Sequence, residues 1–470
     1  METFLRAVSA FVFTLLLTGC AIGPRYHDPK FDVPDKYREF QVTANRESMA
    51  DLPWWEVFKD DALKNLIREA IVNNYDLKIA AARVEEARTT MGYVRSNLFP
   101  KTDLTAAGER DRNSQSLYPS LDRLTNIYSS GFQTGWEIDL WGQIRQQVSA
   151  AKSEWIATEE AQRGVLVSLV ADVATSYFTL CTYDLQLKIA VDTLKIRGDT
   201  LDLFKKREKG GVASHLEVTQ AEADYRETAA NIPELERQIS IQENHINLLL
   251  GKNPGSIPRG KALGEQYYPP DLPPSGVPSD LLKRRPDIVE AEQHLRATTS
   301  LTGAAVGNFL PKLNMLNFVG GAGRQPKDIW SANGYTWQIS GDVKFPLFRG
   351  GENYYKYRMA KARWEKSLEN YKLKATDAFR EVADSLRDIQ KYRQVREEQE
   401  KRVVALREGA QLARMRYEGG VSSYLEVLDA ERNRFNGENT LADVQGKQLN
   451  AYAALYRSLG GGWQREEKAV

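Results

Sequence analysis

The chain contains two copies of one sequence unit, and this duplication restricts its fold more than any other feature. Residues 210–222 align with residues 419–431 at a shift of 209, and nine of the thirteen aligned positions are identical. Residues 97–101 (Asn-Leu-Phe-Pro-Lys) match residues 308–312 (Asn-Phe-Leu-Pro-Lys) at a shift of 211. Unrelated helical segments would not share a proline and a glycine pair in register. We therefore expect two copies of one structural unit.

Each copy contains one long stretch without proline. The two stretches, residues 143–209 and 350–418, are 67 and 69 residues long. At about 1.5 Å per residue, such a helix is about 100 Å long, which exceeds the helices of a compact domain. Apolar residues from Val403 to Tyr417 follow the alternating spacing of three and four residues that is typical of a coiled-coil seam. The sequence therefore predicts two long coiled-coil helices.

A glycine pair ends each long stretch, and glycine pairs terminate helices and favour a reversal of the chain. These predicted hairpin tips are Gly210 with Gly211 and Gly419 with Gly420. We expect the chain to return as a helix in each copy, over residues 214–250 and 422–458. A helical pattern also opens each copy, over residues 61–96 and 280–307.

Segments of alternating polarity lie between these helices, at about 100–140 and about 312–347. In the clearest one, from Tyr335 to Phe345, apolar and polar residues alternate with the period of a β-strand. That run covers about 33 Å, and a tilt of about 40° gives the height of the apolar band of an outer-membrane barrel. After the amino-terminal apolar run we expect no second apolar stretch of 18 residues, which leaves a barrel as the way to cross a membrane. An amphipathic sheet that covers a soluble core is the alternative.

The amino terminus has the pattern of a secretory signal. Residues 8–17 are mostly apolar but too short to span a bilayer. Leu17-Thr18-Gly19-Cys20 fits a bacterial lipobox, so we expect cleavage after residue 19 and acylation of Cys20. An ordinary signal peptide with an incidental cysteine is the alternative. Ala21 stands where an Asp would retain a lipoprotein at the inner membrane, which favours the outer membrane.

Composition and motifs exclude several classes of protein. The 64 basic and 63 acidic residues give a net charge of +1, which argues against a nucleic-acid binder. We find no GxSxG, HExxH, P-loop or CxxC motif, and the four histidines lack the spacing of metal ligands. We therefore expect no enzyme, no cofactor and no metal site. Cys181 is expected to be a buried, unreactive thiol in a helix.

Several motifs, taken in order, resemble the TolC superfamily of outer-membrane efflux channels, and in particular its NodT-type lipoprotein branch. These motifs are Gly23-Pro-Arg-Tyr-His-Asp-Pro29, Trp54-Trp55 with Phe58, Arg83-Val-Glu-Glu-Ala-Arg88, Trp136-Glu-Ile-Asp-Leu-Trp-Gly142, Arg284-Arg-Pro-Asp-Ile288 and the paired Gly-Gly-Val-x-Ser tips. The resemblance covers nearly the whole mature chain.

The resemblance implies an internally duplicated α+β membrane protein. In it, a long α-helical coiled-coil barrel, the periplasmic tunnel, continues into a trimeric twelve-stranded β-barrel with four strands per chain. An association of several chains also follows from physics, because four strands cannot close a barrel and open edges in lipid leave backbone groups unpaired. The number three comes from the family.

The implied function is the outer-membrane channel of a tripartite efflux system in a Gram-negative bacterium. It passively conducts drugs or other small toxic compounds and forms a homotrimer in outer-membrane lipid. Its partners are a periplasmic membrane-fusion adaptor protein and an inner-membrane pump of the RND type, or of the MFS or ABC type. The alternatives are a type I protein secretion duct, and a lipid-anchored periplasmic coiled-coil adaptor that does not span the membrane.

The resemblance also implies a gate at the periplasmic tip, formed by a ring of acidic side chains beyond the hairpin turns. The matching positions are Glu426 and Asp429 in the second copy and Glu217 in the first, where Gln220 replaces the second acid. The family's latch, which ties the tip of one hairpin to its neighbour, matches Tyr417 with Glu217. Ser422 stands where some relatives have a basic latch residue.

The expected division of the chain follows the repeats. Residues 1–19 are the signal peptide and 20–60 a lipidated, extended segment. Residues 61–258 form the first repeat, 259–279 a proline-rich linker, 280–462 the second repeat and 463–470 a tail.

Overall fold

A computed structural model describes residues 22–29, 32–34, 52–117, 119–120, 122–268 and 278–461 of the chain. The expected signal peptide, the expected acylation site Cys20 and the expected tail 463–470 lie outside the described residues. The chain divides into two compact units. The first comprises residues 83–159 and 290–372 with the amino-terminal segment, and the second comprises residues 32–82, 160–289 and 373–470.

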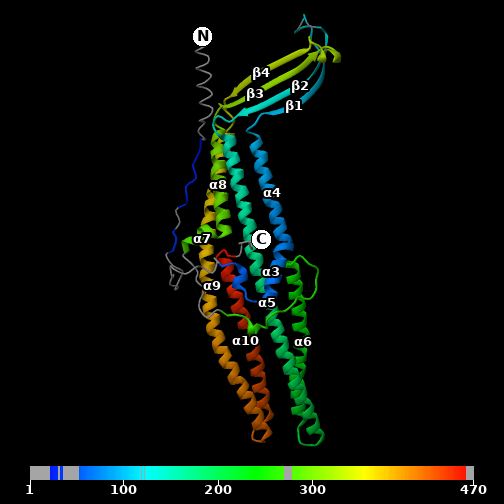
Figure 1. Cartoon of the computed structure of the whole chain (residues 1–470), viewed down its shortest axis with the longest axis vertical. Coiled ribbons are helices and arrows are strands. Elements are labelled where there is room, and N and C mark those ends of the chain that lie inside the picture. Colours follow the sequence, from blue (N-terminus) through cyan, green and yellow to red (C-terminus); the bar gives the residue numbers. More distant parts are fainter. Residues whose placement is uncertain are drawn as a thin grey trace, which may run out of the picture. The chain divides into compact units, whose positions relative to one another are not determined.

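The first unit contains a four-stranded antiparallel sheet with the strand order β1-β2-β3-β4 (Figure 1). The strands are β1 (Lys101–Arg112), β2 (Leu124–Ile138), β3 (Lys312–Gly323) and β4 (Tyr335–Lys344), and a short 3₁₀ helix, η3 (Pro326–Trp330), connects the last two. Each copy therefore supplies two strands, as the alternating pattern predicts.

The register gives the sheet one apolar and one polar face. Leu104, Phe132, Val319 and Trp337 are paired in one row across the four strands. Directly opposed residues point to the same side of a sheet, so this row forms an apolar face. Glu137, Asn314 and Asp342 form a row across three strands, at odd spacing from the first row and therefore on the opposite face. The prediction of two-faced strands is confirmed for β2 and β4, whereas β3 also places Leu316 and Phe318 on the polar face.

Two long helical hairpins account for nearly half of the chain. In Figure 1, α5 returns as α6 and α9 returns as α10. Their bounds are α5 (Gln143–Lys209), α6 (His215–Leu249), α9 (Glu352–Glu418) and α10 (Tyr424–Ser458). Both long helices have 67 residues, so the absence of proline predicted their lengths to within two residues.

Shorter helices complete the described part. They are α2 (Trp54–Val57), α3 (Asp61–Asn73), α4 (Tyr75–Ser96), η2 (Leu263–Glu265), α7 (Pro278–Arg284) and α8 (Pro286–Gly307). The core of the second unit contains buried residues from α2, α3, α5, α6, α7, α9, α10 and η2, among them Trp54, Tyr177 and Tyr456.

One expectation about apolar stretches is wrong. Among the described residues, α5 contains an 18-residue window with a mean hydropathy of 1.6, which is long and apolar enough to span a membrane. Within the chain 61% of that window is buried, because α5 crosses the core of the second unit. The window is therefore part of a helix inside a protein core. It does not weaken the prediction that the strands cross the membrane.

The opening helix of each copy is broken, which the sequence pattern did not predict. The break between α3 and α4 lies at Asn74, and the break between α7 and α8 lies at Arg285. Asn74 Nδ2 donates a hydrogen bond to the carbonyl of Leu249 at 2.9 Å, and Arg285 Nη1 donates one to the carbonyl of Ser458 at 2.8 Å. Each side chain thus bonds a backbone carbonyl that has no partner within its helix, at the carboxyl end of the returning helix. The two contacts lie at equivalent points of the two copies.

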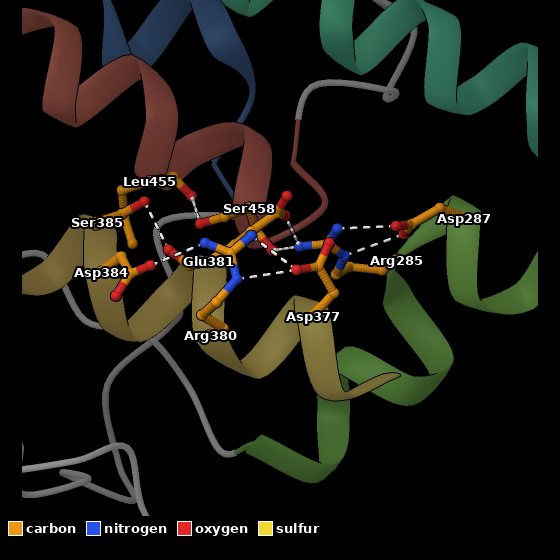
Figure 2. A network of polar contacts seen from close by, with 9 residues as sticks. All are labelled: Arg285, Asp287, Asp377, Arg380, Glu381, Asp384, Ser385, Leu455 and Ser458. Carbon is orange, nitrogen blue, oxygen red and sulfur yellow. Dashed lines mark hydrogen bonds and ion pairs between the residues drawn. The ribbon is translucent and has the colours of Figure 1, made fainter. Parts of the chain in front are cut away.

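Arg285 is also held by carboxylates (Figure 2). Its guanidinium donates to Asp287 at 2.8 Å and 3.0 Å and to Glu381 at 2.8 Å. Burial would raise the pKa of Asp287, but the hydrogen bond and charge of Arg285 outweigh burial and lower it. Arg285 therefore joins α8, α9 and α10 through one buried side chain.

Asp60 ties the segment after the first repeat to α3. Its carboxylate accepts hydrogen bonds from Tyr177 at 3.0 Å, Lys261 N at 3.0 Å and Gln266 at 2.8 Å, and it caps α3 through Ala62 N at 2.9 Å. Burial alone would raise the pKa of Asp60, but these hydrogen bonds hold it below its ordinary value.

Candidate functional site

The two hairpin turns have the same backbone geometry. Gly211 and Gly420 adopt positive φ angles of +74° and +73°, the left-handed conformation that glycine favours. Val212 N donates to the carbonyl of Arg207 at 2.9 Å, and Val421 N donates to the carbonyl of Arg416 at 3.0 Å. Each glycine pair therefore ends its long helix with the same C-terminal cap.

The helices that follow the turns begin differently. Ser214 and Glu217 form a capping box at the start of α6, in which Ser214 N donates to Glu217 Oε2 at 2.7 Å. Ser214 Oγ donates to the same carboxylate at 2.9 Å. Ser423, at the start of α10, makes no such side-chain bond. The Glu217 carboxylate therefore already accepts hydrogen bonds from Ser214, at the start of its own helix.

Glu426 and Asp429 lie one turn apart on an exposed face of α10. Glu426 has a long ion pair with Arg416, at 3.6 Å, and Asp429 accepts a hydrogen bond from Asn433 at 3.2 Å. Both contacts are on the surface, so neither carboxylate is fixed by burial. The first-copy position Gln220 lies one turn beyond Glu217 and is half-buried.

Tyr417 contacts the other hairpin of its own chain. Arg207 Nη1 donates to Tyr417 Oη at 2.8 Å, and the guanidinium lies 5.5 Å from the centre of the tyrosine ring. Among the contacts of the described residues, none joins Tyr417 to Glu217. Within one chain, the structure thus gives the two expected latch residues different partners.

An aromatic cluster surrounds this contact. Phe204 of α5 is fully buried, and its ring centre lies 4.1 Å from that of Tyr424 and 6.0 Å from that of Tyr417. The two tyrosine rings meet edge to face at 5.5 Å. Burial raises the pKa of the Tyr424 hydroxyl above its ordinary value. The two hairpin tips of one chain therefore share a small apolar core.

A partly buried ion pair lies near this cluster. The Asp224 side chain on α6 is 10% exposed, and it faces Arg432 of α10 at 3.3 Å. Arg197 of α5 donates to the carbonyl of Asp224 and to Thr228 Oγ1, each at 2.7 Å. Three helices are connected by these four side chains.

The sequence reasoning missed Arg207, Phe204 and the Asp224–Arg432 pair. The divergence of the repeats marks the surface where they meet, although it does not identify these residues themselves. At a shift of 209, Glu208 is equivalent to Tyr417 and His215 to Tyr424. In the first copy these positions pair with each other, because His215 Nδ1 lies 2.8 Å from Glu208 Oε1. In the second copy the two tyrosines contact each other and also pack against Phe204 of the other hairpin.

The described amino-terminal segment, residues 22–29, lies on the first unit. Ile22 N donates to the carbonyl of Trp141 at 3.1 Å, where β2 leads into α5. The Tyr26 hydroxyl donates to Glu292 at 3.1 Å, and the Arg296 guanidinium lies 4.1 Å from the Tyr26 ring centre. Ile22, two residues after Cys20, is thus held at the end of the sheet where β2 leads into α5.

Other titratable groups agree with a structural role. Burial raises the pKa of the Cys181 thiol to about 12, and its side chain is buried in α5, as expected from the sequence. Within the described part of the chain, no group of three or more His, Cys, Asp or Glu side chains could hold a metal ion.

The comparisons with known proteins agree with this architecture. The family model described as "Outer membrane efflux protein" matches the chain twice, over residues 66–252 and 277–461. The cation efflux system protein CusC of Escherichia coli O6:H1 is 32% identical over 458 residues, with 97% of this chain and 98% of CusC covered. The toluene efflux pump outer membrane protein TtgI of Pseudomonas putida is 34% identical over 456 residues, with 96% and 97% covered. The solved structure of the outer-membrane channel OprN superimposes with a TM-score of 0.85 at 29% identity, covering 95% of this chain and all of that one.

Proposed function

This chain belongs to the outer membrane efflux protein family and is the outer-membrane channel of a tripartite efflux system, and from this premise we propose that it passively conducts drugs or other small toxic organic compounds to the outside. The family consists of channels, and we extend this to the proposal that the chain itself catalyses no reaction. As an outer-membrane component of an efflux pump, it works with a periplasmic adaptor and an inner-membrane pump.

The two-faced sheet is the observation that carries the proposal. Its apolar row suits lipid, and its opposite face has Glu137, Asn314 and Asp342, which suit water. A sheet that separates lipid from water in this way can line an aqueous pore.

We propose that three chains assemble into one twelve-stranded barrel. The strands β1 and β4 are the edges of the sheet, and in lipid each unpaired backbone group at an edge costs several kcal/mol. Pairing of β1 with β4 of the next chain removes both edges. The repeats that form each subunit are assigned to residues 61–258 and 280–462.

Acylation of Cys20 is part of the proposal. The contact between Ile22 and Trp141 supports it, because it holds the start of the mature chain beside the base of the membrane sheet. Acyl chains on Cys20 would then enter the inner leaflet of the outer membrane.

We further propose that Glu426, Asp429 and Glu217 form an acidic ring at the periplasmic tip, and that Tyr417 and Glu217 latch this tip between neighbouring chains. The exposure of Glu426 and Asp429 on one face of α10 supports the ring. Tyr417 accepts a hydrogen bond from Arg207, so its own phenolic proton stays available to a carboxylate of the next chain.

The hairpin tips are also the proposed docking surface for the adaptor. Each tip exposes the same three apolar side chains, and the fractions exposed run from 45% to 80%. These residues are Leu203, Val212 and Leu216 on the first tip, and Leu412, Val421 and Leu425 on the second. Because the two trios are equivalent, each chain offers two similar sites to one type of partner. The pump beyond the adaptor is proposed to be of the RND type, with MFS and ABC pumps as alternatives.

Cargo of organic compounds is favoured over soft metal ions. The six methionines, at positions 1, 49, 91, 315, 359 and 415, are dispersed along the chain, whereas thioether ligands for copper or silver need to be grouped. This proposal differs from the cation efflux named for CusC and agrees with the toluene efflux named for TtgI.

Electrical recording and susceptibility measurements test the function together. The purified protein, added to planar phospholipid bilayers, should produce discrete current steps. Deletion of the gene should increase susceptibility to dyes, detergents and toluene, and leave susceptibility to copper and silver salts unchanged. The absence of current steps would contradict the channel, and a metal-sensitive deletion strain would contradict the cargo. Lost secretion of a protein in that strain would favour the type I duct.

A further inference from the structure

Two arginines lie on the apolar face of the sheet. Across the four described strands, the only charged residues on the face of Leu104 and Trp337 are Arg110 and Arg112 of β1. The opposite face has acidic and basic residues on all four strands, Glu137 among them. The apolar face is therefore uncharged except at one end of β1.

The sequence at this end of β1 alternates in charge. It reads Glu109-Arg110-Asp111-Arg112, and neighbouring residues of a strand point to opposite faces. Both acids therefore lie on the polar face and both arginines on the apolar face. The two arginines are exposed, and among the contacts of the described residues neither guanidinium has a hydrogen bond or an ion pair. Two cationic groups are thus available on one face, with their Cα atoms about 7 Å apart.

The arginines lie just beyond the apolar band that would face lipid. On the apolar face of β2, Ile138 and Tyr128 are ten positions apart. That stretch is about 33 Å long, and a tilt of about 40° gives it the height of the apolar band of an outer-membrane barrel, about 25 Å. Arg110 and Arg112 pair with residues two and four positions beyond Tyr128. A basic residue at this level costs little, because it can reach the polar headgroups.

This end of the sheet is remote from the helices (Figure 1). The strand β1 follows α4 and β2 leads into α5, so the carboxyl end of β1 is opposite to the helical end. Because the helices form the periplasmic tunnel, the arginines lie at the external surface of the outer membrane. The external leaflet of a Gram-negative outer membrane consists mainly of a glycolipid whose disaccharide head has two phosphate groups.

We propose that Arg110 and Arg112 bind the phosphate groups of this glycolipid and so fix the level of the sheet in the external leaflet. Guanidinium groups bind phosphate through paired hydrogen bonds, and each arginine can take one phosphate. The apolar face beside them contacts the acyl chains of the same lipid. A free anion would gain only the first of these contacts. The inference rests on the membrane position that is proposed above for the sheet.

Native mass spectrometry of the purified, detergent-solubilised protein tests this site. The probe is lipid A with two phosphates, titrated into the unmodified protein and into Arg110→Gln with Arg112→Gln. The variant should bind lipid A about thirtyfold more weakly, the change expected for the loss of two basic residues at a charged membrane surface. Arg110→Lys with Arg112→Lys keeps both charges but loses the paired hydrogen bonds, so its affinity should lie between the two.

The matched control removes two exposed cations of α9 through Lys401→Gln with Arg402→Gln. Lys401 pairs with Glu398 and Arg402 bonds to Gln399, both on the same helix. This variant changes the net charge by the same amount, and it should bind lipid A as the unmodified protein does. A loss equal to that of the Arg110→Gln, Arg112→Gln variant would show that net charge decides, and it would overturn the inference.

Dephosphorylated lipid A tests the role of the phosphates, and it should bind the unmodified protein as weakly as lipid A binds the Gln variant. Equal affinity of the unmodified protein for the two lipids would overturn the inference, as would an unchanged affinity of the Gln variant for lipid A. Inorganic phosphate at the concentration of lipid A should not displace it, and displacement would assign the site to the free anion.

Circular dichroism and current steps in planar bilayers establish that each variant has folded and assembled. If the Gln variant does not assemble, the Lys variant and the dephosphorylated lipid still carry the test. The current steps of the unmodified protein test the proposed function itself. A channel that conducts but does not prefer lipid A therefore contradicts only the lipid site.

Discussion

At the scale of single residues, Asp60 is the clearest test of how the linker segment is held. We expect Asp60→Asn to lower the free energy of unfolding by about 2 kcal/mol at pH 7, because a buried charged acceptor of several hydrogen bonds is lost. The folded-state pKa of Asp60 is lowered, so its stabilisation is complete above the ordinary value of about 3.9 and disappears as the pH falls through the lowered value. The difference between the two proteins should therefore narrow below about pH 4.

Denaturant unfolding followed by circular dichroism in detergent measures this difference. The neighbouring Asp61→Asn is the control, because that side chain is 90% exposed and pairs only with Lys64 at 3.1 Å among the ion pairs of the described residues. It should change stability by about 0.5 kcal/mol or less. Equal effects of the two substitutions would contradict the role given to Asp60.

The sequence could place the tip residues but not their partners. The glycine pairs, Glu426 and Asp429 follow from motifs and from a spacing of three residues, which are local signals. The partner of Tyr417 depends on a contact between segments that are 210 positions apart. Arg207 is one of 64 basic residues, and no local pattern distinguishes it. The contacts of Asn74 and Arg285 could not be predicted either. The two residues occupy equivalent positions in the repeats, but they are of different types, so the repeat alone does not indicate that both bond the end of the returning helix.

At the scale of elements, the helix-ending glycines differ in what surrounds them. Gly251 has a φ of +67°, and a Cβ there would lie 2.6 Å from the carbonyl oxygen of Asn73. Gly420 has a similar φ, and nothing lies within 4 Å of the same position. An alanine at either site must adopt the left-handed conformation, which is unfavourable by about 1–2 kcal/mol. At Gly251 the backbone must move as well.

We therefore expect Gly251→Ala to lower the unfolding midpoint clearly more than Gly420→Ala does. Both variants are compared by thermal unfolding in the same detergent. Similar midpoints for the two variants would show that the contact between Gly251 and the end of α3 adds little to stability.

The elements themselves were predicted well, because their signals are long and repeated. The absence of proline marked the long helices, and period-two alternation marked the strands. The breaks at Asn74 and Arg285 were missed for different reasons. Pro286 follows Arg285, and a residue before proline disfavours the helical conformation, so that break had a visible signal. Asn74 has no such neighbour, and its bond to Leu249 decides the break.

At the scale of the whole molecule, the proposed acidic ring should select between ions. Three chains with Glu426 and Asp429 bring six carboxylates together, which attracts cations. Glu426→Gln with Asp429→Asn should reduce cation selectivity, read as a smaller reversal potential in a salt gradient across a planar bilayer. Removing two exposed acids of α9, Glu397→Gln with Glu398→Gln, is the control for net charge. A reversal potential that falls equally in both variants would contradict a ring at the tip.

The apolar window of α5 has a consequence for biogenesis. Export carries the chain across the inner membrane before its core exists, and this stretch is apolar enough to remain in that bilayer. The side chains that later enclose it, such as Leu449 and Tyr452 of α10, emerge near the end of the chain. We therefore expect this stretch to need shielding from lipid during transit, until the carboxyl-terminal helix arrives to cover it.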